Sequence, residues 1–134
     1  MTTPDTSVVV AAFARWHEHH DRARAALANG TQLIGHVAVE AYSVLTRLPA
    51  PRRVPADLAI RLLAEHFGRP SLVLNGAGYE STLQHAGEHG IAGGSVYDAV
   101  IAATALNAGA TILTLDERAV ATYREVGADY ELLL

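Results

Sequence analysis

Apolar and small residues fill nearly every position from Ser95 to Gly109, and Asp98 is the only charged residue among them. A helix that is apolar on all faces is one that the rest of the protein covers, so this segment predicts a buried helix. Gly109 ends that helix, and the apolar residues 111–115 predict a buried strand that leads directly to Asp116. The pattern therefore puts one acidic side chain on a covered helix and another at the end of a buried strand.

Elsewhere the chain alternates short apolar runs with amphipathic segments. Further strands are predicted at residues 2–5, 32–35, 71–74 and 130–133. Further helices are predicted at 8–14, 21–28, 37–48, 55–67, 77–89 and 117–126. The first of these would have Thr6 or Ser7 as its N-cap, and the second would end at Asn29-Gly30. Strands separated by helices predict an α/β protein, a three-layer sandwich in which helices flank a mainly parallel central sheet of about five strands.

The composition restricts the classes of protein to be considered. A chain of 134 residues is long enough for one domain, which we expect to span residues 1–134. No apolar run is long enough to cross a bilayer, the N-terminus lacks the pattern of a secretory signal, and there is no cysteine. We therefore expect a cytoplasmic protein without membrane contacts, disulfides or thiolate metal sites.

The charge balance does not exclude a nucleic-acid substrate. The chain has fourteen acids, ten basic residues that are all arginine, and a formal charge of −4. If four acids hold a metal ion, the other ten equal the arginines in number. Arginine is well suited to phosphate contact, but a surface so balanced argues against loose binding driven by the release of counterions.

Four acids are predicted to meet at one edge of the sheet. Asp5 and Asp116 follow strands, and sites in parallel α/β sheets form beyond the carboxyl ends of the strands. Glu40 lies early in its helix at the edge of the buried stripe, and Asp98 has the matching place in the covered helix. Four converging carboxylates repel one another until a proton or a cation intervenes. Oxygen ligands favour Mg²⁺ or Mn²⁺ over zinc.

Each acid also has an ordinary structural explanation. Asp5 and Asp116 could be N-caps of the helices that follow them, and Glu40 could be a partly exposed helix residue. Asp98 is the hardest to explain in this way, because a lone carboxylate in apolar surroundings is costly unless a cation or hydrogen bonds hold it. When the four acids are taken together, a common site is favoured over coincidence.

The segments around these acids resemble the four acidic motifs of PIN-domain ribonucleases, most closely those of the VapC-type toxins of bacterial toxin–antitoxin pairs. The segments are Asp5-Thr6-Ser7, Val39-Glu40-Ala41, Tyr97-Asp98-Ala99 and Thr114-Leu115-Asp116. The resemblance runs in order along essentially the whole chain and is most specific in the last two motifs. Where the family has apolar residues before its first aspartate, this chain has Thr2, Thr3 and Pro4, so we expect the first strand to be truncated or weak.

This resemblance implies a PIN-like fold and a metal-dependent endoribonuclease. The catalytic and metal-binding residues would be Asp5, Glu40, Asp98 and Asp116, with Glu40 bound directly or through water to the Mg²⁺ or Mn²⁺ ion. Thr6 and Thr114 would hydrogen-bond those carboxylates or their waters, or else be ordinary strand-end hydroxyls. The implied partners are an RNA substrate, a VapB-like antitoxin and a second copy of the chain, in a heterotetramer or larger assembly with the antitoxin.

Two other functional classes compete with the nuclease. A catalytically weak or inactive PIN-like module that binds RNA or protein would tolerate the loss of an acid, whereas all four are present. An aspartyl phosphotransfer domain needs a second acid close to its nucleophile or a lysine, and this chain has no lysine. The nuclease is therefore the favoured interpretation.

The remaining polar residues carry weaker signals. His17 and His20 could share a helical face and ligate a metal, but a solvated loop is favoured because no third ligand follows at a recognisable spacing. Arg47, Arg52 and Arg53 could contact RNA phosphates or be exposed loop arginines. The other histidines are scattered and no role is predicted for them; they are His36, His66, His85 and His89.

Overall fold

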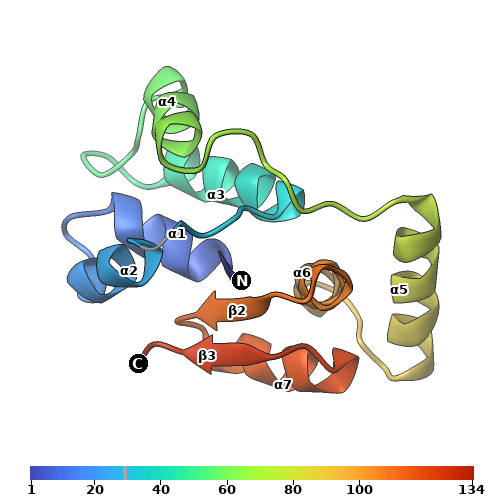
Figure 1. The fold of residues 1–134 in the computed structure, drawn as a ribbon. Coiled ribbons are helices and arrows are strands. Elements are labelled where there is room, and N and C mark those ends of the chain that lie inside the picture. The colour runs from blue at the N-terminus through green and yellow to red at the C-terminus, as the bar shows by residue number, and fades with distance from the viewer. Residues whose placement is uncertain (29) are drawn as a thin grey trace.

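The computed structural model describes residues 1–28 and 30–134 and has the α/β architecture expected from the sequence (Figure 1). Three short strands form a parallel sheet of order β1-β2-β3. The strands are β1 (Thr2–Pro4), β2 (Thr111–Thr114) and β3 (Tyr130–Leu132). The helices of the described residues are α1 (Thr6–Phe13), α2 (His20–Leu27), α3 (Gly35–Arg47), α4 (Ala56–Phe67), α5 (Gly76–Glu88), α6 (Ser95–Ala108) and α7 (Glu117–Val126).

The predicted helices and the strands at both ends of the chain agree with the structure to within one or two residues. Gly109 ends α6 in the left-handed conformation, with φ of 66°, as the sequence predicted. The N-cap of α1 is Asp5, so the prediction of Thr6 or Ser7 was wrong and the alternative prediction of Asp5 is confirmed. The predicted end of the second helix at Asn29 lies outside the described residues.

The three-layer arrangement follows from alternation along β2. Ile112 belongs to a core cluster that includes Ile101 of α6 and Tyr123 of α7, whereas Leu113 belongs to a second cluster with Val8 of α1. Because successive side chains of a strand point to opposite faces of a sheet, the two clusters fill the two sides of β2. The sheet is therefore packed between helices on both faces, as predicted.

The sheet has three strands in the described part of the chain, fewer than the five or so that were predicted. Residues 32–35 and 71–74 form only a parallel bridge between Ile34 and Leu72. Helix α3 begins at Gly35, directly after this bridge, so the first of these segments has no room for a longer ladder. Two predicted strands are thus reduced to a single pair of residues.

The first strand is short but fully paired, although its residues are not typical of a buried strand. Thr3 is fully buried opposite Ile112, and its hydroxyl donates to the Gln32 carbonyl at 2.8 Å. Pro4 has no N–H to offer, and the next N–H, that of Asp5, donates to the Leu113 carbonyl at 2.9 Å. These bonds hold the end of β1 in register with β2.

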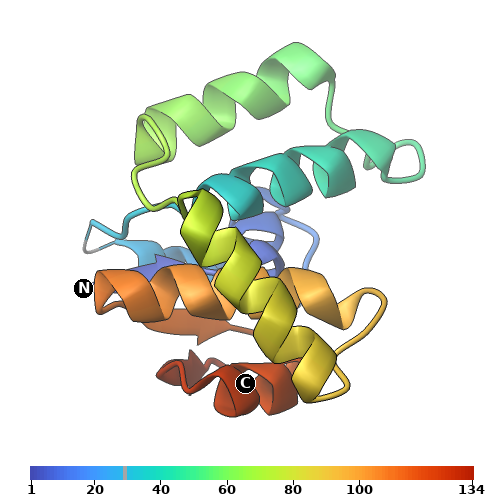
Figure 2. The ribbon, with the colours of Figure 1, turned by 90° about the vertical axis from the view of Figure 1, so that its right-hand side faces the viewer.

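Helix α6 is the central helix of the molecule, as its apolar sequence predicted. It lies between α5 and α7 and also contacts α3 and β2. Figure 2 shows α5 crossing the outer side of α6, while α3 and α4 are stacked along another side of α6. Six of its residues are buried, among them Ile101 and Ala105. Asp98 lies in the first turn of this helix.

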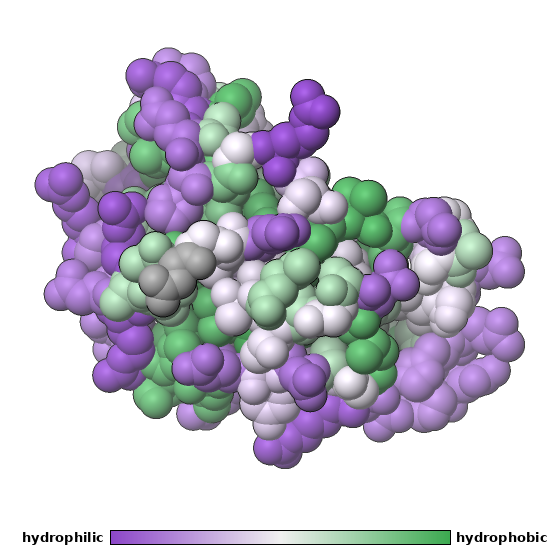
Figure 3. Space-filling model, in the orientation of Figure 1, coloured by the Kyte–Doolittle hydropathy of each residue, from purple (hydrophilic) through white to green (hydrophobic). Residues whose placement is uncertain are grey.

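The face seen in Figure 1 is hydrophilic around its outline, while apolar and weakly polar residues occupy its centre (Figure 3). That centre overlies the beginning of the chain, β2 and α6. Among the described helices, none has both the length and the apolar character needed to cross a membrane.

Candidate functional site

The four acids line one pocket of about 380 Å³ at the carboxyl ends of β1 and β2. Asp5 comes from the end of β1, Glu40 from α3, Asp98 from the first turn of α6, and Asp116 from the end of β2. Thr6, Ser7, Arg47, Arg118 and Tyr123 are also in its lining. The structure therefore brings together the residues that the sequence motifs singled out.

Asp5 is the most deeply held of these acids. Its Oδ1 accepts from the Val8 N–H at 3.3 Å and from the Ser7 hydroxyl at 2.5 Å. Its Oδ2 accepts from the Tyr123 hydroxyl at 2.8 Å. Burial raises the pKa of Asp5, and hydrogen bonds from Ser7, Thr114, Tyr123 and Val8 oppose that rise by stabilising the carboxylate.

Tyr123 is a fixed donor to this carboxylate. It is fully buried, and burial together with the adjacent Asp5 raises the pKa of its hydroxyl. The hydroxyl therefore stays protonated at any working pH and can only donate to Asp5. Tyr123 lies 118 residues from Asp5 in the sequence, and no spacing pattern could have identified it.

Asp116 begins α7 as Asp5 begins α1. Its Oδ1 accepts from the Arg118 N–H at 2.9 Å, while its own N–H donates to the Thr114 hydroxyl at 3.0 Å. Thr114 is fully buried. Thr6, by contrast, has a buried hydroxyl without a hydrogen-bond partner among the described residues. The two threonines predicted to support the carboxylates thus differ in what they contact.

Glu40 faces a histidine that the sequence reasoning did not assign. His36, one helical turn earlier on α3, places its Nε2 2.5 Å from Glu40 Oε1, without the alignment of a hydrogen bond. The His36 ring stacks on Tyr97, with centroids 5.4 Å apart and planes 19° from parallel. The i,i+4 spacing of His36 and Glu40 is the signal that could have revealed this pair.

The pKa of Asp98 is raised, as expected for a carboxylate that lies near other carboxylates. Its pKa rises from 3.8 to about 6 because of burial first, and then because of the charges of Asp116, Asp5 and Glu40. His36 opposes the rise. Asp98 thus holds a proton to an unusually high pH, and a cation that binds there relieves the same repulsion.

The donor chemistry of the pocket fits a hard divalent cation. The four acids provide oxygen donors and the chain has no cysteine, which suits Mg²⁺ or Mn²⁺. In the described part of the chain no three of these carboxylates have oxygens within 4.8 Å of one another. Coordination by three or more of them therefore requires side-chain rotation toward the centre of the pocket.

Of the three arginines predicted to contact phosphate, Arg47 alone lines the pocket. Arg52 lies over the Trp16 ring, 4.3 Å from its centroid, and Arg53 donates from Nε to the Leu48 carbonyl at 2.9 Å. Arg118, which the sequence reasoning missed, is at the pocket edge with its Nε 3.8 Å from Asp116 Oδ1. The cations at this edge are therefore Arg47 and Arg118 in the described part of the chain.

His17 and His20 do not share a helical face. His17 precedes α2 and its Nδ1 accepts from the His19 N–H at 3.0 Å, while His20 is the first residue of α2 and its Nδ1 lies 2.8 Å from the Ala11 carbonyl. The loop interpretation of this segment is confirmed.

The fold recurs in known proteins. The structure superposes on FitAcB from Neisseria gonorrhoeae with a TM-score of 0.72 and 19% identity, covering 99% of this chain and 98% of that one. A structure of FitAB bound to the IR36 DNA fragment gives a TM-score of 0.73, also with 19% identity, covering 99% of this chain and 95% of that one. At this level of identity the likeness shows a shared fold.

Sequence comparison defines the family. Residues 3–125 match the PIN domain. Ribonuclease VapC40 of Mycobacterium tuberculosis is 47% identical over 133 residues, 99% of either chain. Ribonuclease VapC27 of the same organism is 40% identical over 124 residues, 92% of this chain and 90% of the relative. The chain therefore belongs to the PIN-domain family and, within it, to the VapC-type ribonucleases.

Proposed function

We propose that the protein is a metal-dependent endoribonuclease whose active site is the acidic pocket. The main support for this proposal is that four carboxylates from four different elements line one pocket, where the pKa of Asp98 is raised to about 6. The relatives named ribonuclease support RNA as the substrate. The presence of all four acids in one pocket favours an enzyme over a PIN-like module that only binds.

Asp5, Glu40, Asp98 and Asp116 would hold Mg²⁺ or Mn²⁺. When bound, such an ion lowers the pKa of a coordinated water for attack on a phosphodiester and stabilises the leaving oxygen. Asp5 is already oriented for this role by Tyr123 and Ser7. Glu40, paired with His36, is the ligand that acts directly or through water.

The hydroxyls at the pocket have supporting roles. Thr114 holds the N–H of Asp116 and lowers the pKa of Asp5, so it fixes both strand-end acids. Thr6 has a buried hydroxyl in the pocket lining without a partner among the described residues, and it would hydrogen-bond a carboxylate or a water of the site. Arg47 and Arg118 at the pocket edge would contact RNA phosphates and fix the register of the chain.

Metal dependence is tested with purified protein and defined RNAs. Cleavage should stop when EDTA is in excess and return when Mg²⁺ or Mn²⁺ is restored above the chelator. Undiminished cleavage in EDTA would contradict the proposal. A mutant chain prepared in parallel, Asp116→Asn, controls for contaminating nucleases, because a contaminant would cleave equally in both preparations.

We also propose that this ribonuclease is the toxin of a VapBC-type pair in the cytoplasm, acting as a single domain over residues 1–134 and as a homodimer. A VapB-like antitoxin would restrain it in a heterotetramer or a larger assembly. The rim of four carboxylates is a favourable place for an arginine or lysine of that partner, which would make charge-assisted hydrogen bonds and block the metal.

The toxin proposal has its own test. Expression of the chain alone should arrest growth, expression of Asp98→Asn should not, and co-expression with the small protein encoded beside it should restore growth. Normal growth with the wild-type chain alone would contradict the toxin role without contradicting RNA cleavage. Sedimentation of the free protein at micromolar concentration tests the dimer, and a monomer alone would exclude it.

A further inference from the structure

A second cluster of metal-ligating side chains lies away from the acidic pocket. His85 and His89 of the α5 end and Glu125 of the last turn of α7 bring one ligand atom each within 4.8 Å of one another. None of the three lines the acidic pocket. This cluster joins two helices that are separated by the whole of α6 in the sequence.

The hydrogen bonding of His89 fixes which of its nitrogens is free. Its Nδ1 lies 2.9 Å from the His85 carbonyl, and a carbonyl can only accept, so Nδ1 carries the hydrogen. In the neutral ring, Nε2 therefore presents a lone pair. That Nε2 faces Glu125 Oε1 at 3.4 Å, so two acceptors point at each other. Either a proton on Nε2 or a shared metal ion resolves this arrangement. An imidazole that donates its other N–H to a carbonyl is the usual state of a metal-binding histidine.

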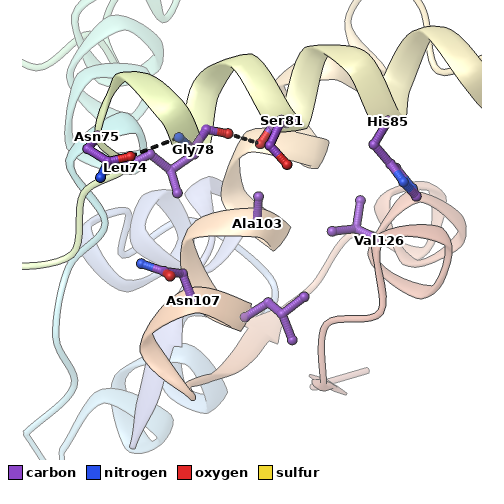
Figure 4. Close-up of a pocket in the computed structure, with 10 residues that line it drawn as sticks. Leu74, Asn75, Gly78, Ser81, His85, Ala103, Asn107 and Val126 are labelled. Carbon is purple, nitrogen blue, oxygen red and sulfur yellow. Dashed lines mark hydrogen bonds between the residues drawn. The ribbon is translucent and has the colours of Figure 1, made fainter.

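His85 has a nitrogen that lacks a partner. Its Nε2 is buried and makes no hydrogen bond within the described part of the chain, which leaves a desolvated polar atom at a cost in stability. Its ring stacks on that of His89, with centroids 4.0 Å apart and planes 23° from parallel. Figure 4 shows His85 pointing from α5 toward Val126 of α7, at one end of a cleft of about 370 Å³ between α5, α6 and α7.

We propose that His85, His89 and Glu125 form a zinc-binding site that ties α5 to α7. Two imidazole nitrogens and one carboxylate oxygen are a donor set that suits Zn²⁺ and is poor for Mg²⁺. Zn–N bonds of about 2.0–2.1 Å put tetrahedral ligand atoms roughly 3.3 Å apart. Metal binding requires side-chain rotations that bring the ligand atoms, now within 4.8 Å of one another, to that spacing. The fourth position remains open to water.

The structural consequence concerns α5. It is reached through the extended segment after α4 and packs mainly on α6 (Figure 1), while its end carries both histidines. A metal bound across α5 and α7 fastens that end to a second helix. Binding to the folded chain alone then raises stability by mass action.

Calorimetric titration with Zn²⁺ tests the site, using Asp98→Asn as the parent protein so that the acidic pocket lacks one carboxylate. The parent should bind one Zn²⁺, and Zn²⁺ should raise its melting temperature. Adding Glu125→Gln should weaken that binding by at least about tenfold, and so should His85→Gln. Glu88→Gln is the matched control, because Glu88 lies on α5, is exposed and contacts Gln84 instead of the cluster.

The outcomes separate cleanly. Loss of one Zn²⁺ in Glu125→Gln but not in Glu88→Gln supports the site, and X-ray absorption of the zinc complex should show two imidazole ligands. Equal affinity in those two variants, or no Zn²⁺ binding by the parent, overturns it and leaves an ordinary ion pair between His89 and Glu125. Because Glu125 is exposed, its substitution does not endanger the fold, and RNA cleavage stays a separate measurement.

Discussion

Asp5 both caps a helix and lines the acidic pocket. One of its oxygens accepts from the Val8 N–H, and the other accepts from Tyr123. Asp116 does the same at α7, where its Oδ1 accepts from the Arg118 N–H. Capping and site formation are therefore not alternatives for these residues. The strand end, the cap and the pocket meet at one point, and the cap orients the carboxylate that the pocket needs.

The hydroxyl of Tyr123 should matter to stability more than its size indicates. Tyr123→Phe leaves Asp5 Oδ2 buried without its donor, which should cost about 1–3 kcal/mol of unfolding free energy. Tyr130→Phe is the control, because the Tyr130 hydroxyl only accepts a hydrogen bond from Arg124 at the surface. This substitution should change the unfolding free energy by no more than about 0.5 kcal/mol. Urea unfolding measures both, and equal losses would show that Asp5 does not depend on Tyr123.

Asp98 should make the metal-free protein sensitive to pH. Its pKa is about 6 in the folded protein and 3.8 ordinarily. Between these two pH values the folded chain therefore holds a proton that the unfolded chain has released. The stabilisation is complete below pH 3.8 and is lost as pH rises through about 6. Relative to wild type, Asp98→Asn should therefore gain melting temperature between pH 4 and pH 7 in EDTA. A difference that does not change with pH would contradict the coupling.

At the scale of elements, the strand–acid–helix units were readable in the sequence because they are local. Asp116 lies between β2 and α7 in the sequence, and Asp5 lies directly before α1. The reduction of two predicted strands to the bridge of Ile34 and Leu72 was not readable, since it depends on where α3 starts in space.

Long-range side-chain partners were out of reach for the same reason. The contacts of Tyr123 with Asp5 and of His89 with Glu125 join distant segments. Periodicity reports which face of an element is apolar, but it does not report which other element lies opposite. The four acids were identified from the sequence because each lies in a local motif. Most of their polar partners lie in no such motif and were not identified.

Two glycine-to-alanine substitutions near helix ends should change stability in opposite directions. Gly109 has φ of 66° with no atom within 4 Å of an added Cβ, so Gly109→Ala should cost about 1 kcal/mol from backbone strain alone. Gly87 lies inside α5 with the same open space and no positive φ, so Gly87→Ala should stabilise by roughly 0.5–1 kcal/mol. Thermal unfolding of the two variants distinguishes strain from crowding, and a loss in both would contradict this account.

The acidic pocket exists only in the whole folded molecule, because its acids span residues 5 to 116 of the chain. A metal that they hold binds the native state and not the unfolded chain, so folding and binding are coupled. Mg²⁺ at a hundred times its dissociation constant should stabilise the protein by about 2.7 kcal/mol, and Asp98→Asn should lose most of this gain. An unchanged melting temperature of the wild type in saturating Mg²⁺ would exclude a site on these residues.

The most direct test of the central claim is the rate of RNA cleavage by Asp98→Asn in saturating Mg²⁺, measured beside Asp129→Asn. Both variants remove one negative charge, but Asp129 is exposed and outside the pocket. We predict that Asp98→Asn loses at least about a hundredfold in rate, equivalent to about 2.7 kcal/mol of activation free energy, while Asp129→Asn cleaves like the wild type. Cleavage by Asp98→Asn at the wild-type rate would contradict the assignment of the acidic pocket as the active site.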